Sequence, residues 1–481
     1  MKRTAFILVL VAFAITAMAQ STARKFTLKN SADGNSEITV HLPVNPSGRA
    51  IVDCPGGGYR NLAMDHEGFD WVEYFNKQGI AFVVLKYRMP NGDKNIPLSD
   101  AYNAIKTVRD SADAWHVNPR DVGIMGFSAG GHLASAVSTH APFTVRPDFS
   151  ILFYPVVSME QRVSHKGSCV NFLGDGQNDK NMIKEWSSDK AVRRHLTPPA
   201  IILTANDDRT VPPVTNGIAY YSAMRNAGND CTLHVYPTGG HGFGFRSTWK
   251  HHDQMLNDLT EWLDNIKAPK VSSVKVACVG NSITDGHGIE MASQRGYPAN
   301  LQRLLGNDYH VKNFGVSSRT MSNRGDHPIQ NEMAWRDCLG FKPDVVVIKL
   351  GTNDTKPSNW QYAKDDYIPC LAQMIDSLRT VSSDPRIIVC SPIPAFKSTW
   401  DINDSIIVNA IIPMLKKFTA ENRVEYLDLY TPFRPLEDHV LTDGIHPNDK
   451  GVVKMAEIIS GVIKQERPVF KKVKGKNKKS K

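Results

Sequence analysis

Two serines in glycine-rich turns are the side chains of this sequence best suited to nucleophilic chemistry. Ser128 lies in the stretch GFSAG, between the apolar run VGIM and the helical pattern HLASAVSTH. Ser282 lies in VGNSITDG and also follows an apolar run. A G-x-S-x-G pattern between a strand and a helix is typical of a nucleophile elbow, in which small residues permit a tight turn that exposes the hydroxyl. Each serine then needs a base, an acid and oxyanion donors from elsewhere in the chain.

For Ser128, the oxyanion donors are expected in a glycine run. The stretch DCPGGGYR follows an early apolar strand. Because glycines let backbone N–H groups approach a developing oxyanion, we expect Gly57 or Gly58 to form the hole together with the N–H of Ala129.

The acid and the base of the first set follow in the chain order Ser, Asp, His. The stretch TANDDRTVPP follows a strand and offers both Asp207 and Asp208. We favour Asp208, because the acid usually stands directly before the x-x-V-P run that starts the next helix. His241, in GGHGF, is the expected base, which takes the Ser128 proton while the acid holds its tautomer.

Three later stretches of the sequence supply candidate catalytic partners for Ser282. NFGVSS offers Gly315, LGTND offers Asn353, and LTDGIHPN places Asp443 three residues before His446. An acid and a base on one tight turn can both reach inward, so Asp443 would orient His446 and His446 would deprotonate Ser282. The oxyanion would be bound by the N–H groups of Ser282 and Gly315 and by the Asn353 amide.

Other side chains near these motifs have two possible interpretations. His132, in the helix after Ser128, and His234, in a strand, are interpreted as structural. Tyr59, Phe243 and Trp335 would either stack on a sugar or an aryl acid, or pack in the core.

The first set resembles a known group of enzymes. The stretches PGGGY, HEG, VLKYR, IMGFSAGGHLA, DDRTVPP and GGHGF resemble α/β-hydrolase esterases associated with xylan degradation, acetyl xylan and feruloyl esterases among them. The resemblance spans about Val40 to Ile266. It departs from the commoner HGGG at Pro55, which replaces the histidine and leaves the glycines intact.

The second set is similar to the SGNH, or GDSL-like, hydrolases, whose name lists the Ser, Gly, Asn and His. This resemblance covers roughly Val274 to Lys464. Asn281 stands where the family often has Asp, a position that does not carry the proton. The resemblance implies a flavodoxin-like esterase domain.

The alternation of β-branched runs with helical patterns predicts two α/β domains built on parallel sheets. We expect an α/β-hydrolase domain followed by a flavodoxin-like SGNH hydrolase domain. The predicted division is a signal peptide at 1–19, the first domain at 22–266, a linker at 267–273, the second domain at 274–465 and a basic disordered tail at 466–481. The segment Val157 to Leu196 interrupts the alternation and is expected to cap the first pocket.

Charge and motifs exclude several classes of partner. The formal net charge is +9, of which Lys2 and Arg3 contribute two and the lysines of the tail 471–481 contribute seven, so the globular body is neutral. We therefore expect no nucleic-acid partner. Metal-binding and nucleotide motifs are absent, so we expect neither a cofactor nor a metal. The seven cysteines form no C-x-x-C pair, and their odd number leaves at least one thiol unpaired.

The start of the chain predicts export. A basic start, a short apolar run and small residues before Gln20 are typical of a secretory signal, with cleavage after Ala19. The destination would be periplasmic or extracellular, without membrane insertion after cleavage.

These observations predict an exported bifunctional serine carbohydrate esterase that removes acyl groups, most simply acetyl, from a polysaccharide such as xylan. Feruloyl esterase activity in the first domain with acetyl esterase activity in the second is an alternative. A peptidase in the first domain is a rival, because the same triad cleaves amides. A glycan-binding protein with one or both hydrolase folds inactive is a rival of another class.

Overall fold

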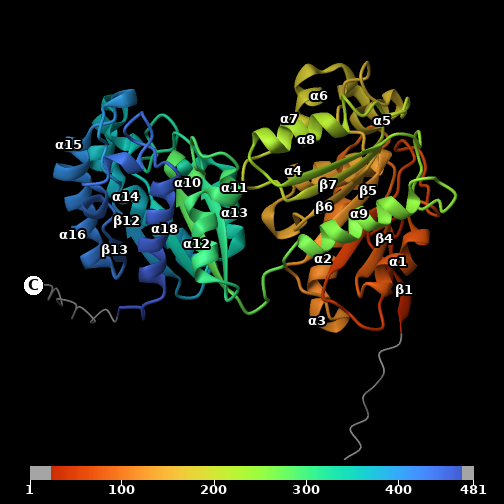
Figure 1. Cartoon of the computed structure of the whole chain (residues 1–481), viewed down its shortest axis with the longest axis horizontal. Helices are drawn as coiled ribbons and strands as arrows, with labels where there is room; N and C mark the ends of the chain where they lie inside the picture. The colour runs from red at the N-terminus through yellow and green to blue at the C-terminus, as the bar shows by residue number, and fades with distance from the viewer. Residues whose placement is uncertain (1–22, 469–481) are drawn as a thin grey trace, which may run out of the picture.

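The computed structural model describes residues 23–468, and these form two sheets, each covered by helices on both faces (Figure 1). We call the parts built on the two sheets the first and the second domain. The predicted signal peptide and most of the predicted basic tail lie outside the described residues. Within residues 23–468 no helix is long and apolar enough to cross a membrane.

The sheet of the first domain has eight strands in the order β1-β2-β4-β3-β5-β6-β7-β8. The strands from β4 to β8 in that order are parallel, but β2 runs antiparallel to both β1 and β4. These first two strands lie before the alternating runs from which the sequence predicts a parallel sheet, and the loop 30–36 joins them as a hairpin. The strands are β1 Arg24–Lys29, β2 Glu37–Leu42, β3 Ala50–Cys54, β4 Ala81–Lys86, β5 Val122–Phe127, β6 Ser150–Phe153, β7 Ala200–Ala205 and β8 Cys231–Tyr236.

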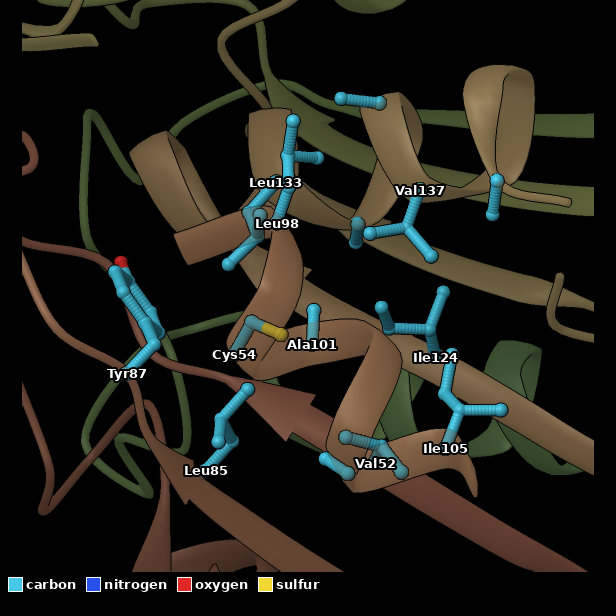
Figure 2. Packing of buried hydrophobic residues seen from close by; sticks show 14 of the residues in the cluster. Val52, Cys54, Leu85, Tyr87, Leu98, Ala101, Ile105, Ile124, Leu133 and Val137 are labelled. Carbon is cyan, nitrogen blue, oxygen red and sulfur yellow. The ribbon is translucent and has the colours of Figure 1, made fainter. Parts of the chain in front are cut away.

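Helices cover both faces of this sheet because neighbouring strand residues point to opposite sides. In β3, Val52 belongs to the core that α2, α4 and α8 cover, whereas Ile51 belongs to the core that α1 and α9 cover. Figure 2 shows the α2 side, where Leu98 and Ile105 meet strand residues such as Val52. The helices are α1 Val72–Lys77, α2 Asn95–Asp110, α3 Ala112–Trp115, α4 Ser128–His140, α5 Lys166–Leu173, α6 Lys180–Trp186, α7 Ser188–Ala191, α8 Gly217–Asn226 and α9 His252–Asn265.

The second domain has a five-stranded parallel sheet in the order β10-β9-β11-β12-β13. This is the 2-1-3-4-5 order of the flavodoxin-like fold, the fold that the resemblance to SGNH hydrolases implies. In β9, Val276 and Cys278 face α12 and α18, whereas Ala277 and Val279 face α13, α14 and α16. The strands are β9 Val274–Gly280, β10 Tyr309–Gly315, β11 Val345–Lys349, β12 Arg386–Cys390 and β13 Glu425–Leu427.

The second domain contains both long and short helices. The long ones bury the faces of the sheet, and the short ones lie near the carboxyl ends of the strands or in the connections. They are α10 Ser282–Asp285, α11 Ala292–Arg295, α12 Tyr297–Leu305, α13 Met333–Phe341, α14 Pro357–Val381, α15 Asp404–Ile406, α16 Ile412–Asn422, α17 Tyr430–Phe433 and α18 Asp449–Ile463.

The two domains lie side by side, with α11 and α13 on the side of the second domain that faces the first (Figure 1). A buried ion pair crosses the interface, with Nη1 of Arg146 2.5 Å from Oδ2 of Asp337. Arg120 donates from Nη1 to Oγ of Ser273, at 2.9 Å, and so holds the linker against the first domain. All seven cysteines are free thiols. Noncovalent contacts therefore hold the domains together.

Replacement of Arg146 by Met is expected to destabilise the protein. It leaves the Asp337 carboxylate buried without its partner, which typically costs about 3–5 kcal/mol. The chemical-denaturation midpoint of the full chain should fall in the Arg146→Met protein and recover partly in the Arg146→Met, Asp337→Leu double variant. Equal midpoints for the wild type and the single variant would contradict the importance of this pair.

Candidate active sites

The tight turn from β5 into α4 determines the position of Ser128. Ser128 is the first residue of α4 and has a φ of 52°, in the left-handed region that side chains rarely adopt. A Cβ at Gly126 would lie 2.2 Å from the carbonyl oxygen of Gly130, so only glycine fits there. Strain of this kind is common where a turn presents a reactive group. The turn places Oγ of Ser128 at the carboxyl end of the sheet.

A histidine and an aspartate approach Ser128 from two other strand ends. Nε2 of His241 lies 2.8 Å from Oγ of Ser128, and its Nδ1 lies 2.7 Å from Oδ2 of Asp208. Oδ1 of Asp208 accepts hydrogen bonds from the N–H groups of Thr210 and Val211, both at 2.9 Å. The structure therefore joins Asp208, and not Asp207, to the histidine. The Asp207 carboxylate instead accepts a hydrogen bond from the N–H of Gly240.

The glycine run borders the same serine. Gly57 and Gly58 line the pocket and have φ values of 134° and 65°. Their N–H groups have no hydrogen-bond partner among residues 23–468, and Ala129 lies in the first helical turn, where N–H groups lack intrahelical acceptors. These groups are free to bind an oxyanion.

Glu67 is a residue of this site to which sequence reasoning assigned no role. It is buried, and Oε2 accepts a hydrogen bond from the N–H of Gly56 at 2.9 Å. Oε1 accepts one from the Tyr154 hydroxyl at 2.7 Å, and the Tyr154 ring packs edge-on against His241. Glu67 thus connects the glycine run with the base. The quoted stretch HEG contains it, but only the folded chain reveals these contacts.

The Ser128 pocket has a volume of about 630 Å³. His165, Gly167 and Asn171 of the segment 157–196 line it together with Ser128 and His241. Asn171 also donates from Nδ2 to the carbonyl oxygen of Gly58, at 2.9 Å. The segment therefore forms one wall of this pocket.

The remaining candidates near the motifs make contacts with other residues than the two serines. His132 is buried, with Nδ1 2.8 Å from the Tyr59 hydroxyl and Nε2 2.9 Å from the Trp186 carbonyl. Nδ1 of His234 lies 3.4 Å from the carboxylate of Asp258. The three aromatic residues considered for substrate stacking are all buried by packing: Tyr59, Phe243 and Trp335.

In the second domain, Ser282 also begins a helix directly after a central strand. It is the first residue of α10, and Oδ1 of Asn281 caps that helix by accepting from the N–H of Ile283 at 3.2 Å. Nε2 of His446 lies 2.7 Å from Oγ of Ser282. Nδ1 of His446 lies 2.9 Å from Oδ2 of Asp443. The Asp443 carboxylate also accepts from the N–H groups of Ile445 and His446, which keeps the loop compact.

The oxyanion side of the second site differs from the expectation at Gly315. The N–H of Gly315 donates to Oδ1 of Asn313 at 2.8 Å, and Gly315 does not line the pocket, so we correct that assignment. Ser318 does line the pocket, with a φ of 68°. Among the described residues, the N–H of Ser318 has no hydrogen-bond partner. The sequence gave no indication of this role, because the backbone conformation of Ser318 is one that favours glycine rather than serine.

Asn353 lies at the pocket with Ser282, as the motif predicts. Nδ2 of Asn353 donates to the Arg319 carbonyl at 3.1 Å, which leaves its second N–H free for a ligand. The pocket has a volume of only about 140 Å³. Trp400, which is 52% exposed, and His287 also line it and pack against the ring of His446.

His287, Asp443 and His446 place one possible ligand atom each within 4.8 Å of one another, a spacing that suits a cation. Two of the three belong to the catalytic set, so such an ion would compete with the Ser282 contact. A further cavity of about 660 Å³ lies between the domains and contains neither serine.

Electrostatics favour a neutral base and an ionised acid at the second site. Burial lowers the pKa of His446 below its ordinary 6.5, and the neighbouring His287 and Lys349 add to this effect against the opposing pull of Asp443. Burial acts to raise the pKa of Asp443, but hydrogen bonds from the N–H groups of His446 and Ile445 hold it below its ordinary value. His446 is therefore ready to accept a proton at neutral pH.

Comparison with known proteins agrees with this geometry. Residues 55–245 match the model of the alpha/beta hydrolase fold, and residues 278–452 match the GDSL-like Lipase/Acylhydrolase family. The chain is 55% identical to an acetylxylan esterase of Xylanibacter ruminicola over 482 aligned positions, which cover 96% of this chain and 100% of that protein. The chain belongs to the same family as that esterase. As a member of this acetylxylan esterase family it is a serine ester hydrolase with two hydrolase domains.

Two more distant relatives of this family member cover single parts of the chain. An endo-1,4-beta-xylanase B of Butyrivibrio fibrisolvens is 31% identical over 211 residues, which are 40% of this chain and 32% of that protein. The solved structure of an acetyl ester-xyloside bifunctional hydrolase from Caldicellulosiruptor lactoaceticus is 30% identical and covers 48% of this chain and 87% of its own, with a TM-score of 0.44.

The lowered pKa of His446 predicts the pH dependence of the second site. A base must be neutral, so activity is lost as the pH falls through its pKa. In the Ser128→Ala protein, kcat/KM for an aryl acetate should reach half its maximum below pH 6.5. His287→Ala in the same background should move this midpoint to higher pH, because it removes a group that opposes protonation of His446. A midpoint that stays fixed or moves down would contradict this electrostatic account.

Proposed function

We propose that this protein is a bifunctional serine carbohydrate esterase that removes acetyl groups from an acylated xylan. The observation that carries the proposal is the presence of two complete Ser–His–Asp sets in one chain, each beside N–H groups that have no hydrogen-bond partner within residues 23–468. The relationship to an acetylxylan esterase supports the substrate class. Export through the predicted signal peptide at 1–19 is part of the proposal, since a polysaccharide substrate lies outside the cell.

At the first site, Ser128 attacks the ester carbonyl while Nε2 of His241 takes its proton. Asp208 holds the other ring nitrogen and stabilises the imidazolium that forms. The N–H groups of Ala129 and of Gly57 or Gly58 bind the oxyanion. His241 then gives this proton to the sugar oxygen as it leaves, and it next deprotonates a water molecule, which attacks the acetyl-serine and releases acetate and Ser128.

At the second site, Ser282, His446 and Asp443 perform the same chemistry. The oxyanion is bound by the N–H groups of Ser282 and Ser318 and by Nδ2 of Asn353. Each donor is worth about 10²–10³ in kcat when one is removed from comparable enzymes. Trp400 gives a sugar ring an exposed aromatic face at the mouth of the pocket.

The unequal pockets favour a division of labour between the sites. About 140 Å³ at Ser282 admits a small acyl group such as acetyl, whereas about 630 Å³ at Ser128 also has room for an aryl acid. This difference is the specific observation in favour of the second candidate function, feruloyl esterase activity in the first domain. Two sites on one chain raise the effective concentration of the second site near a polymer held by the first.

Release of acetate and ferulate from acetylated, feruloylated arabinoxylan tests the proposal. We expect Ser128→Ala and Ser282→Ala each to abolish a different product or a distinct share of the acetate, with losses of at least about 10³-fold for each share. The double variant should release neither acid. Product analysis by chromatography, with the wild type as reference, measures these shares.

Three outcomes would contradict the proposal. If one single variant matches the double variant and the other matches the wild type, one domain is a scaffold. If wild type binds the polymer tightly without releasing either acid, the protein is a glycan-binding protein with inactive hydrolase folds. Cleavage of peptide p-nitroanilides but not of aryl acetates by the wild type would instead assign a peptidase to the first domain.

A further inference from the structure

The segment 157–196, which forms a wall of the Ser128 pocket, ends at the other active site. Arg194 and His195 cross the domain interface to α10, the single turn that begins with Ser282. Nη2 of Arg194 donates to the carbonyl oxygen of Gly286 at 3.1 Å, and Nε2 of His195 lies 2.8 Å from the carbonyl oxygen of Asp285. The first domain thus contacts the end of the helix whose first residue is the nucleophile.

The Asp285 side chain is the centre of these contacts. Its Oδ1 lies 3.1 Å from Nε of Arg194 and 3.2 Å from Nε2 of His195. Burial acts to raise the pKa of Asp285, but the hydrogen bond and charge of His195, with Ser317 and Arg194, hold it below its ordinary value. Asp285 is therefore a buried carboxylate, and both the Arg194 guanidinium and the His195 ring beside it come from the other domain.

Asp285 also connects the two backbone segments that provide oxyanion donors. The Ser317 hydroxyl donates to Oδ2 of Asp285, and the next residue is Ser318, which lines the pocket and whose N–H has no hydrogen-bond partner among the described residues. Ser282 begins the same short helix that Asp285 ends. The relative position of the Ser282 and Ser318 N–H groups therefore depends on a side chain that the first domain holds.

The first domain keeps its two residues rigid for this contact. His195 has a φ of 62°, a conformation that side chains rarely adopt, and its N–H donates to Oδ1 of Asn229 at 2.9 Å. Nδ2 of Asn229 donates in turn to the carbonyl oxygen of Arg193 at 2.9 Å. The His195 side chain is 3% exposed. A strained backbone that its neighbours hold in place is typical of a functional contact.

A four-residue helix is unstable by itself in water, so the position of α10 depends on its contacts with the surrounding segments. Donors at an oxyanion site must stay within about 0.5 Å of the productive geometry. Without Arg194 and His195, the Asp285 carboxylate would be buried with only the Ser317 hydroxyl, and it would turn toward solvent together with that loop.

We propose that Arg194 and His195 of the first domain are positioning residues for the Ser282 site, acting through Asp285 on the two segments that bind the oxyanion. The proposal rests on the proposed function in assuming that Ser282 is a nucleophile. It means that the second active site is completed by the first domain.

The test uses the full chain with Ser128→Ala, so that only Ser282 reacts. Arg194→Ala and His195→Ala should each lower kcat for an aryl acetate by about 10–100-fold, the range for a misplaced oxyanion donor, with KM changed less than about threefold. Arg194→Lys, which keeps the charge, should retain more activity than Arg194→Ala. Arg225→Ala is the matched control, because it breaks an exposed interdomain ion pair with Glu290 that makes no contact with α10 or Ser317.

A second measurement does not need turnover. Amide hydrogen exchange followed by mass spectrometry should show faster exchange in residues 282–288 and 315–319 of the Arg194→Ala and His195→Ala proteins, and unchanged exchange there in Arg225→Ala. Unchanged kcat and unchanged exchange in both variants would overturn the proposal. If the Ser128→Ala protein shows no turnover at all, the proposed function fails at Ser282, while the exchange result still decides whether the first domain holds these segments.

Discussion

Both active sites depend on one constraint, a buried parallel strand that becomes a helix within a single residue. At Ser128 the turn is so tight that the serine itself takes a left-handed backbone and Gly126 has no room for a side chain. At Ser282 the same transition is made after β9, with Asn281 as the helix cap. The carboxyl ends of parallel strands meet at one edge, so acids and bases from distant strands converge on the hydroxyl that each turn exposes.

Much of this arrangement was predictable, because the catalytic residues lie in short sequence motifs that follow the ends of the strands. The alternation of apolar runs and helical patterns predicted a second α/β domain, and the resemblance to SGNH hydrolases implied that its fold is flavodoxin-like. The antiparallel pairing of β1 with β2 was not predicted, because β1 is largely exposed and has no run of buried residues. At Gly315, the motif named the correct loop but the wrong residue, because the partner of each N–H depends on backbone turns that composition does not report. Glu67, Trp400 and Ser318 were missed because their roles come from contacts between distant segments.

The domain interface contains contacts that the sequence motifs of neither domain predict. Arg146 and Asp337 form a buried ion pair, while Arg120 fixes the short linker, so the two sheets are held at a defined separation. The segment 157–196 uses this fixed geometry, because it lines the Ser128 pocket with His165 and reaches α10 with Arg194. Pocket shape at one serine and loop position at the other therefore depend on one stretch of chain.

This shared segment has a consequence for how such a protein changes through descent. His195 and Asp285 are 90 residues apart in the sequence and belong to different hydrolase folds, yet they occupy one buried contact. A substitution at either position alters the environment of the other, so the two halves accumulate changes together. Exchange of a whole domain between related genes at residues 267–273 would separate interface residues that had adapted to each other. The hybrid protein would then have a poorly matched domain interface.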